Sequence, residues 1–228
     1  MMAGVPFANG SLQAPGFGFE ATIDTRPADM YIVPLMLGWH LPKADVNASF
    51  GFFAPTGRYT AGADNNLGKG MWSYELAAGT TLYFDEQKSL SFATSAFWET
   101  HTKKDGTNIR IGNRQLDGVK VGQLLTLEGG LGKSFLQGAA SVGLAYYAQW
   151  KLTDDEFGIP IDLPDGSPIG KHRVYGFGPD VTLPIATKSK LIALVNLRYF
   201  WETGARVKTE GQSLAITATF PVPSVKIK

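Results

Sequence analysis

Ionisable side chains stand on one parity of alternating segments spread along the chain. They are Glu75, Glu99, Glu128, Lys151, Asp180, Arg198 and Glu202. Residues two apart in an extended segment point to the same side, so each of these charges is expected on the polar side of its segment. Charges enclosed by a protein need water or a partner. The set therefore indicates either ion pairs that brace an interior or groups that line a path for solutes.

The same parity also carries aromatic and amide side chains, namely Tyr83, Phe97, Tyr147, Gln149, Asn196 and Phe200. Aromatic side chains in an enclosed space can stack against a phenyl ring, which contributes about 0.5 to 1.5 kcal/mol beyond the burial of area. They can equally serve only to fill the space. Both interpretations stay open, and these side chains join the charged ones as candidates for lining a lumen and for permeation.

Residue types for nucleophilic catalysis are present, but they form no motif. The three histidines are His40, His101 and His172, and no Gly-x-Ser-x-Gly elbow occurs. A membrane-embedded hydrolase is the main enzymatic alternative, yet no serine, acid and base converge in the sequence. The absence of cysteine excludes thiol catalysis, disulfides and cysteine-ligated metals. We therefore predict a protein that is not an enzyme and has no catalytic residues.

Two short stretches have the composition of ligand sites. The acidic run at residues 154–156 could hold Ca²⁺, although such runs are more often solvated loop tips. Residues 129–134 end in Gly-Lys-Ser like a phosphate-binding loop, but the first glycine of that motif is missing at the required spacing. We interpret this stretch as a glycine-rich strand, and we expect no metal and no cofactor.

The elements that must position these residues are short strands. Nine segments alternate between apolar and polar or small residues, over residues 30–41, 46–52, 72–84, 90–99, 125–132, 141–151, 175–183, 191–202 and 213–220. In the first, the apolar side is expected to carry Tyr31, Val33, Leu35, Leu37, Trp39 and Leu41, opposite Met30, Ile32, Met36, Gly38 and His40. The pattern predicts an all-β, antiparallel protein with nine clear strands.

Short turns alternate with longer polar loops along the chain. The turns lie near residues 42–45, 85–88, 135–138 and 184–190, and the loops cover roughly residues 54–71, 101–122, 153–171 and 203–212. Outer-membrane barrels show this asymmetry, with turns at the periplasmic rim and loops outside. A soluble β-sandwich does not require it. The alternation therefore favours an antiparallel transmembrane β-barrel.

Aromatic residues on the apolar parity gather toward the ends that meet the longer loops. They are Trp72, Tyr74, Trp98, Tyr146, Trp150, Tyr199 and Trp201. Aromatic belts of this kind lie at membrane–water interfaces, so we predict contact with lipid there. The mean hydropathy of −0.04 agrees with a barrel, because the hydropathies of apolar and polar residues cancel along alternating strands. The formal net charge of +1 gives no field that would recruit nucleic acid.

Nine strands are an awkward number, because single-chain bacterial barrels have even strand counts. We therefore expect ten to twelve strands in the complete protein. Residues 14–25 could supply a tenth strand, but they are rich in glycine and alternate little, so we favour further strands upstream. The predicted division is an N-terminal segment at residues 1–27, a remnant of an upstream strand and loop, a barrel domain at residues 28–223, and a tail at residues 224–228.

Four stretches are similar to a known family. They are residues 31–42 (YIVPLMLGWHLP), 53–59 (FAPTGRY), 143–153 (GLAYYAQWKLT) and 197–205 (LRYFWETGA). They resemble the outer-membrane proteins grouped under the meta-pathway of phenol degradation, over about residues 28–223. The resemblance implies a porin-like barrel in the bacterial outer membrane, whose partners are membrane lipid and small hydrophobic or aromatic, phenol-like solutes that it transports.

Two other functions stay open beside this one. A barrel that transports nothing could stabilise the membrane or bind partners through its loops. A soluble lipid-binding β-protein is less favoured, because such a protein does not require short turns to alternate with long loops.

Overall fold

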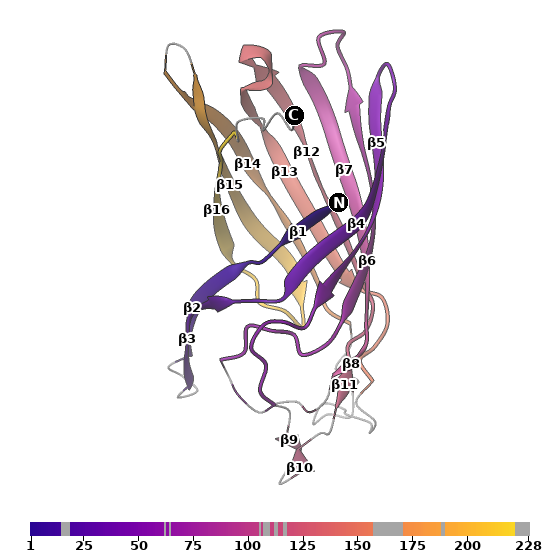
Figure 1. The fold of residues 1–228 in the computed structure, drawn as a ribbon, viewed down its shortest axis with the longest axis vertical. Helices are drawn as coiled ribbons and strands as arrows, with labels where there is room; N and C mark the ends of the chain where they lie inside the picture. Colours follow the sequence, from indigo (N-terminus) through magenta and orange to yellow (C-terminus); the bar gives the residue numbers. More distant parts are fainter. Residues whose placement is uncertain are drawn as a thin grey trace, which may run out of the picture.

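The computed structural model describes residues 1–14, 19–61, 63, 65–104, 106, 110–111, 114–115, 118–156, 171–187 and 190–221. Within these residues the main element is a ten-stranded antiparallel sheet in the order β1-β4-β5-β6-β7-β12-β13-β14-β15-β16 (Figure 1). None of the described helices is long and apolar enough to cross a membrane. The predicted all-β, antiparallel class is confirmed. The predicted tail at residues 224–228 lies outside the described residues.

All nine predicted segments are strands of this sheet, and each neighbour in sequence pairs with the next. They are β4 (Met30–His40), β5 (Ala44–Ala54), β6 (Ser73–Tyr83), β7 (Leu90–His101), β12 (Leu124–Phe135), β13 (Ala140–Lys151), β14 (Arg173–Ala186), β15 (Leu191–Arg206) and β16 (Gln212–Thr219). The tenth is β1 (Met2–Gly4), which pairs with β4. The strands β8 (Lys103–Lys104), β9 (Arg110–Ile111), β10 (Arg114–Gln115) and β11 (Val119–Lys120) form small two-stranded sheets.

The two rims of the sheet differ in the length of their connections. Residues 41–43, 84–89, 136–139 and 187–190 connect strands at one rim, which is the upper one in Figure 1. The β12–β13 connection there contains a short 3-10 helix, η2 (Leu136–Gly138). The lower rim carries the described parts of the long connections, which span residues 55–72, 102–123 and 152–172. The fourth predicted loop, at residues 203–212, was wrong, because β15 continues to Arg206 and leaves only residues 207–211 before β16.

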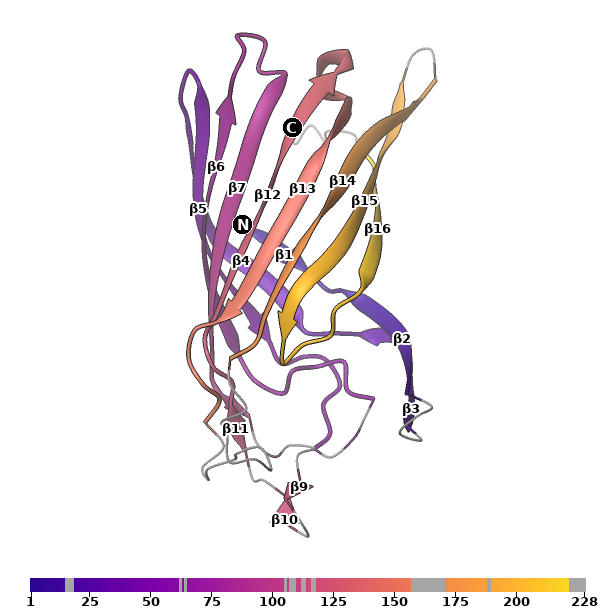
Figure 2. The same ribbon diagram turned by 180° about the vertical axis from the view of Figure 1, so that it is seen from behind.

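The sheet curves strongly around a central space but does not close (Figure 2). β1 and β16 are its two edges, and no pairing joins them in the part of the chain that the structure describes. β1 is only three residues long and covers Tyr31 to Val33 of β4, while every residue of β16 is exposed. The predicted closed barrel is therefore corrected to an open, barrel-like sheet, because the N-terminal residues pair too briefly with β4 to complete the wall.

The remaining N-terminal residues form a separate hairpin. β2 (Phe7–Ala14) pairs with β3 (Phe19–Pro27) in a sheet of its own. Residues 14–25 therefore do not supply the tenth strand of the main sheet, which is formed by β1 instead. In both views the hairpin projects away from the main sheet, on the side where the wall is open (Figures 1 and 2).

A β-bulge in β4 changes the side on which two residues lie. The pairing of β4 with β5 shifts between Ile32 and Leu35, so that Val33 and Pro34 together oppose Gly51. Proline cannot donate a hydrogen bond to the ladder and is common at bulges. The bulge reverses the parity of Tyr31 and Val33 relative to Leu35. The predicted apolar, outward side for Tyr31 and Val33 was therefore wrong, and Val33 is almost completely buried.

Candidate functional site

The register places all the lumen candidates on one face of the sheet. Residues directly opposite each other in antiparallel strands share a face, and Glu75 opposes Glu99, as Asp180 opposes Arg198. The same face carries Tyr83, Phe97, Glu128, Tyr147, Gln149, Lys151, Asn196, Phe200 and Glu202. It is the inner face, because Glu75 is 7% exposed whereas Leu76, its neighbour in sequence, is 51% exposed. A role of these residues in permeation stays a prediction.

The opposite, outer face exposes large apolar side chains. Leu144 is 64% and Phe177 55% exposed, and Leu35, Val142, Leu183 and Ile216 are similar. The predicted aromatic residues lie on this face, and several form ring pairs, such as Trp72 with Phe52 at 5.8 Å and Trp150 with Tyr175 at 5.9 Å between ring centroids. Trp72, Trp98 and Trp150 stand at strand ends that meet the long connections, whereas Tyr146 and Tyr199 lie deeper along β13 and β15.

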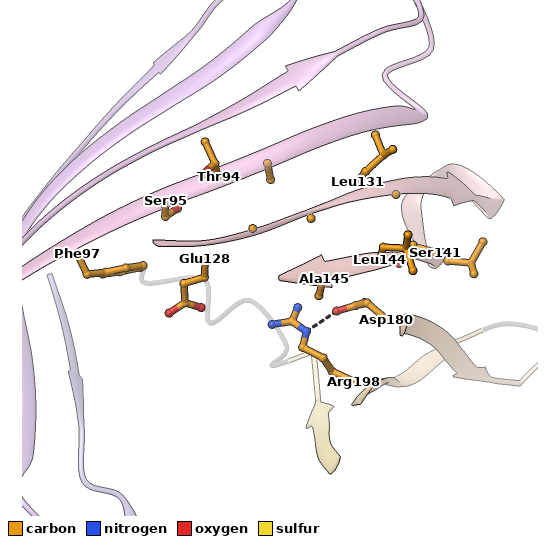
Figure 3. Close-up of a pocket in the computed structure, with 16 residues that line it drawn as sticks. Thr94, Ser95, Phe97, Glu128, Leu131, Ser141, Leu144, Ala145, Asp180 and Arg198 are labelled. Carbon is orange, nitrogen blue, oxygen red and sulfur yellow. Dashed lines mark hydrogen bonds and ion pairs between the residues drawn. The ribbon is translucent and has the colours of Figure 1, made fainter. Parts of the chain in front are cut away.

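A hollow of about 310 Å³ opens on the inner wall, across β7, β12, β13, β14 and β15. Figure 3 shows Phe97 and Glu128 at one end of it and the Asp180–Arg198 pair at the other. The wall between them consists of small residues, which are Ala93, Ser95, Gly130, Gly132, Ser141, Gly143 and Ala145. The site is therefore a shallow, nearly side-chain-free surface with charged groups at both ends.

Glycine is required where the strands below this hollow approach each other. A Cβ atom on Gly143 would collide with the carbonyl oxygen of Leu131, and one on Gly130 would come within 2.6 Å of the carbonyl oxygen of Leu144. These are backbone atoms, which cannot rotate away. The close approach explains why residues 129–132 are rich in glycine. The structure confirms this stretch as part of a strand. Because glycine has no side chain, the inner wall stays open at these positions.

One end of the hollow is a closed set of polar contacts, here called the braced network (Asp180, Asn196 and Arg198). Arg198 Nε donates to Asp180 Oδ2 at 2.5 Å, and Asn196 Nδ2 donates to Asp180 Oδ1 at 2.9 Å. Asn196 Nδ2 also lies 3.0 Å from Thr182 Oγ1. Both carboxylate oxygens of Asp180 are thus satisfied. For these residues the structure supports the bracing interpretation.

The other end carries Glu128, which belongs with Glu75 and Glu99, farther along the inner wall, to a group here called the acidic cluster. Tyr31 donates its hydroxyl to Glu75 Oε1 at 2.5 Å, and Lys69 Nζ lies 3.7 Å from Glu99 Oε2. Among the described residues, the Glu128 carboxylate has no hydrogen-bond partner and no ion pair. The electrostatic fields of Glu99 and Glu128 both act on Glu75. Three carboxylates therefore stand together on the inner wall, and the described residues place one cation, Lys69, in an ion pair with them.

The comparison with known families bears on this geometry. The family described as "Putative MetA-pathway of phenol degradation" matches residues 2–218. The chain belongs to this family. The match confirms the resemblance predicted from the four sequence stretches, and it extends that resemblance to the N-terminal strands. No curated protein sequence matches the chain.

Aromatic residues of this phenol-degradation family member lie beside the charged groups of the inner wall. Tyr147 and Phe200 form a T-shaped pair with ring centroids 5.0 Å apart, and Tyr147 donates its hydroxyl to Glu202. Tyr83 donates to Asp45 Oδ2 at 2.5 Å. The sequence reasoning missed Tyr31 as an inner residue, although Pro34 within the strand was a signal for the bulge that turns it inward.

The long-loop rim brings further polar residues to the inner wall. The buried carboxylate of Asp29 accepts hydrogen bonds from the backbone N–H groups of Gly57 (2.9 Å) and Lys69 (2.7 Å), so it fixes the β5–β6 connection at two points. Lys69 Nζ lies 4.1 Å from the centroid of the Phe53 ring. Sequence reasoning did not identify Asp29 or Lys69, because loop residues carry no parity signal.

His40, His101 and Asp155 have polar partners within the described structure, whereas Nε2 of His172 is buried without one. His101 Nδ1 lies 2.9 Å from Ser73 Oγ, but Ser73 is completely buried, so this pair offers no accessible nucleophile. His40 pairs with Asp45 at 2.8 Å. At the rim, Asp155 contacts Lys151 Nζ at 2.7 Å and the N–H of Gly122 at 2.8 Å. Burial lowers the pKa of His172, which keeps this side chain neutral near pH 7.

Proposed function

We propose that this family member closes into a barrel in the bacterial outer membrane and lets small hydrophobic or aromatic molecules pass through its lumen, without a catalytic step. The observation that carries the proposal is the opposite character of the two faces of the sheet. The outer face exposes Leu144, Phe177 and Ile216, whereas Glu75 and Ser73 are buried on the inner face. A soluble protein would have to expose a large apolar surface to water, whereas lipid would cover it.

The membrane environment also requires closure of the sheet. Unpaired backbone groups cost several kcal/mol each in hydrocarbon, so an edge such as β16 is not tolerated there. The proposal therefore includes pairing of the β16 edge when the protein enters the membrane. The even number of strands in the main sheet, in which all pairings are antiparallel, is compatible with that closure.

The inner wall supports passage of single-ring compounds. The hollow of about 310 Å³ has a nearly side-chain-free floor, and Phe97, Tyr147 and Phe200 share the same face. The family description, which names phenol degradation, supports an aromatic solute. A second candidate function is a barrel that transports nothing. The braced network favours it, because its charges are engaged with one another.

Flux into proteoliposomes separates these functions. Vesicles with the protein should equilibrate phenol-sized neutral solutes faster than empty vesicles, and the Tyr147→Ala/Phe200→Ala variant should change that flux. The matched control is Phe177→Ala, which removes a ring of similar size from the outer face. A folded protein whose vesicles behave like empty ones would reject transport and support the second candidate. Unchanged flux in the folded double variant would reject stacking by these two rings.

A further inference from the structure

Carboxylates outnumber cations on the inner wall of the main sheet. Among its described strands, the inward ionisable side chains are Asp45, Glu75, Glu99, Glu128, Asp180 and Glu202 against Lys151 and Arg198, with His40 and His101 at the two rims. The net charge of the whole chain is only +1, so this imbalance is local. The interior of the sheet and the rest of the chain therefore differ in charge.

The basic groups near the inner wall are already engaged. Arg198 is held by Asp180 at 2.5 Å, and Lys151 is held by the loop residue Asp155 at 2.7 Å. Three lysines reach the wall from connections: Lys69 lies 3.7 Å from Glu99, Lys88 Nζ lies 4.6 Å from the centroid of the inward Tyr83 ring, and Lys208 donates to the neutral side chain of Gln149 at 2.5 Å. Because Asp155 adds a further carboxylate, the acidic groups remain in excess after these contacts.

Several of the carboxylates are held by neutral donors or by none. Glu75 accepts from the hydroxyl of Tyr31, and Glu202 accepts from Tyr147 and from the N–H of Gly211. A neutral donor stabilises a carboxylate but leaves its negative charge in place. The described residues give Glu128 no partner at all. The uncancelled charge therefore lies on the acidic cluster and at Glu202, all on the inner face of the sheet.

We infer that the lumen favours neutral and positively charged solutes and excludes anions. This inference rests on the proposed function. Rings of acidic side chains select cations in channels, and a cleft lined by charge of one sign concentrates counter-ions. An aromatic amine in its protonated form and an uncharged phenol would pass, whereas an aromatic carboxylate of the same size would be repelled by the acidic cluster.

The first test is the reversal potential of the protein in a planar lipid bilayer across a KCl gradient. We expect K⁺ to permeate over Cl⁻ by at least about threefold. Replacing the acidic cluster with Glu75→Gln, Glu99→Gln and Glu128→Gln should bring the ratio toward one. The matched control is Glu86→Gln, an exposed carboxylate in the β6–β7 turn. The single Glu128→Gln variant breaks no hydrogen bond or ion pair of the described residues, so it gives a second test if the triple variant does not fold.

The second test uses three single-ring solutes of nearly equal size, which are benzylammonium, benzyl alcohol and benzoate at neutral pH. Benzoate should enter proteoliposomes at least about threefold more slowly than either of the other two solutes. Equal entry of all three, or equal K⁺ and Cl⁻ permeability, would overturn the inference and leave the proposed function standing. No entry of any solute or ion through the folded protein would overturn both.

Discussion

The braced network and the acidic cluster reach one hollow from its two ends, through Asp180 and Arg198 and through Glu128, and use similar residues in opposite ways. In the braced network, a carboxylate directly opposes a guanidinium and both of its oxygens are satisfied. In the acidic cluster, Glu75 directly opposes Glu99, and the nearest cation lies 3.7 Å away, on a loop lysine. The difference shows that the register decides whether a charge on the inner face becomes a structural contact or an uncancelled field.

The energetic consequence follows from the pairing. Removing one member of a partly buried pair leaves the other without compensation, whereas removing one of several like charges relieves repulsion. We therefore expect mutations in the braced network to lower the free energy of unfolding. Mutations in the acidic cluster should instead change which ions and solutes pass.

The largest effect is expected from a substitution at Gly178, in the strand that carries Asp180 of the braced network. A Cβ atom on Gly178 would collide with the carbonyl oxygen of Tyr199 on β15. Gly178→Ala should lower the free energy of unfolding by at least about 2 kcal/mol, because a backbone shift is needed to relieve the contact. The control is Gly38→Ala, where the nearest atom would be 3.9 Å away. Urea titration in lipid vesicles measures both, and equal stabilities would contradict the close approach.

A smaller loss is expected from Arg198→Ala, which leaves Asp180 without its cation. The Arg198 side chain is 40% exposed, so solvent screening reduces the effect, and we expect about 1 to 2 kcal/mol of lost unfolding free energy. Glu128→Gln in the acidic cluster should change stability by less than about 0.5 kcal/mol, because no hydrogen bond or ion pair of the described residues is lost. If the two variants are equally stable, the distinction between the two ends of the hollow is wrong.

Tyr31→Phe tests the one hydroxyl that supports the acidic cluster. Glu75 is almost completely buried and loses its donor in this variant, so we expect a cost of about 1 kcal/mol. Tyr74→Phe on the outer face is the control, since the described structure shows no hydrogen bond for that hydroxyl. A thermal or urea unfolding series that shows no difference would mean that Tyr31 does not support Glu75.

The smallest effect is expected at the long-loop rim, beyond both ends of the hollow. Burial lowers the pKa of His172, and the positive charges of Lys151 and Lys208 act in the same direction. The folded state thus favours the neutral ring. Its contribution to stability is present above the unfolded pKa of about 6.5 and is lost as the pH falls below it. Limited proteolysis of the rim should accelerate between about pH 7.5 and pH 5.5, and His172→Gln should flatten that dependence.

Sequence patterns predicted the strands well and their mutual arrangement poorly. Alternation of apolar and polar residues identified β5, β6 and β7, because each strand has a polar and an apolar side whichever strand it pairs with. The bulge at Pro34 and the tight β15–β16 connection were missed, because both depend on how two strands pair. The pairing of Asp180 with Arg198 could not be read from the sequence either, since a shift of one residue would place them on opposite faces.

By itself, the sequence determined that the chain is a β-protein with a polar and an apolar side to each strand, because side-chain direction in a strand has a period of two. It also determined the family. Only the tertiary structure decided which charges face one another, because register is set by turns and bulges acting over many strands. The same reason explains why Tyr31 points inward and why the edges at β1 and β16 remain apart in the described residues.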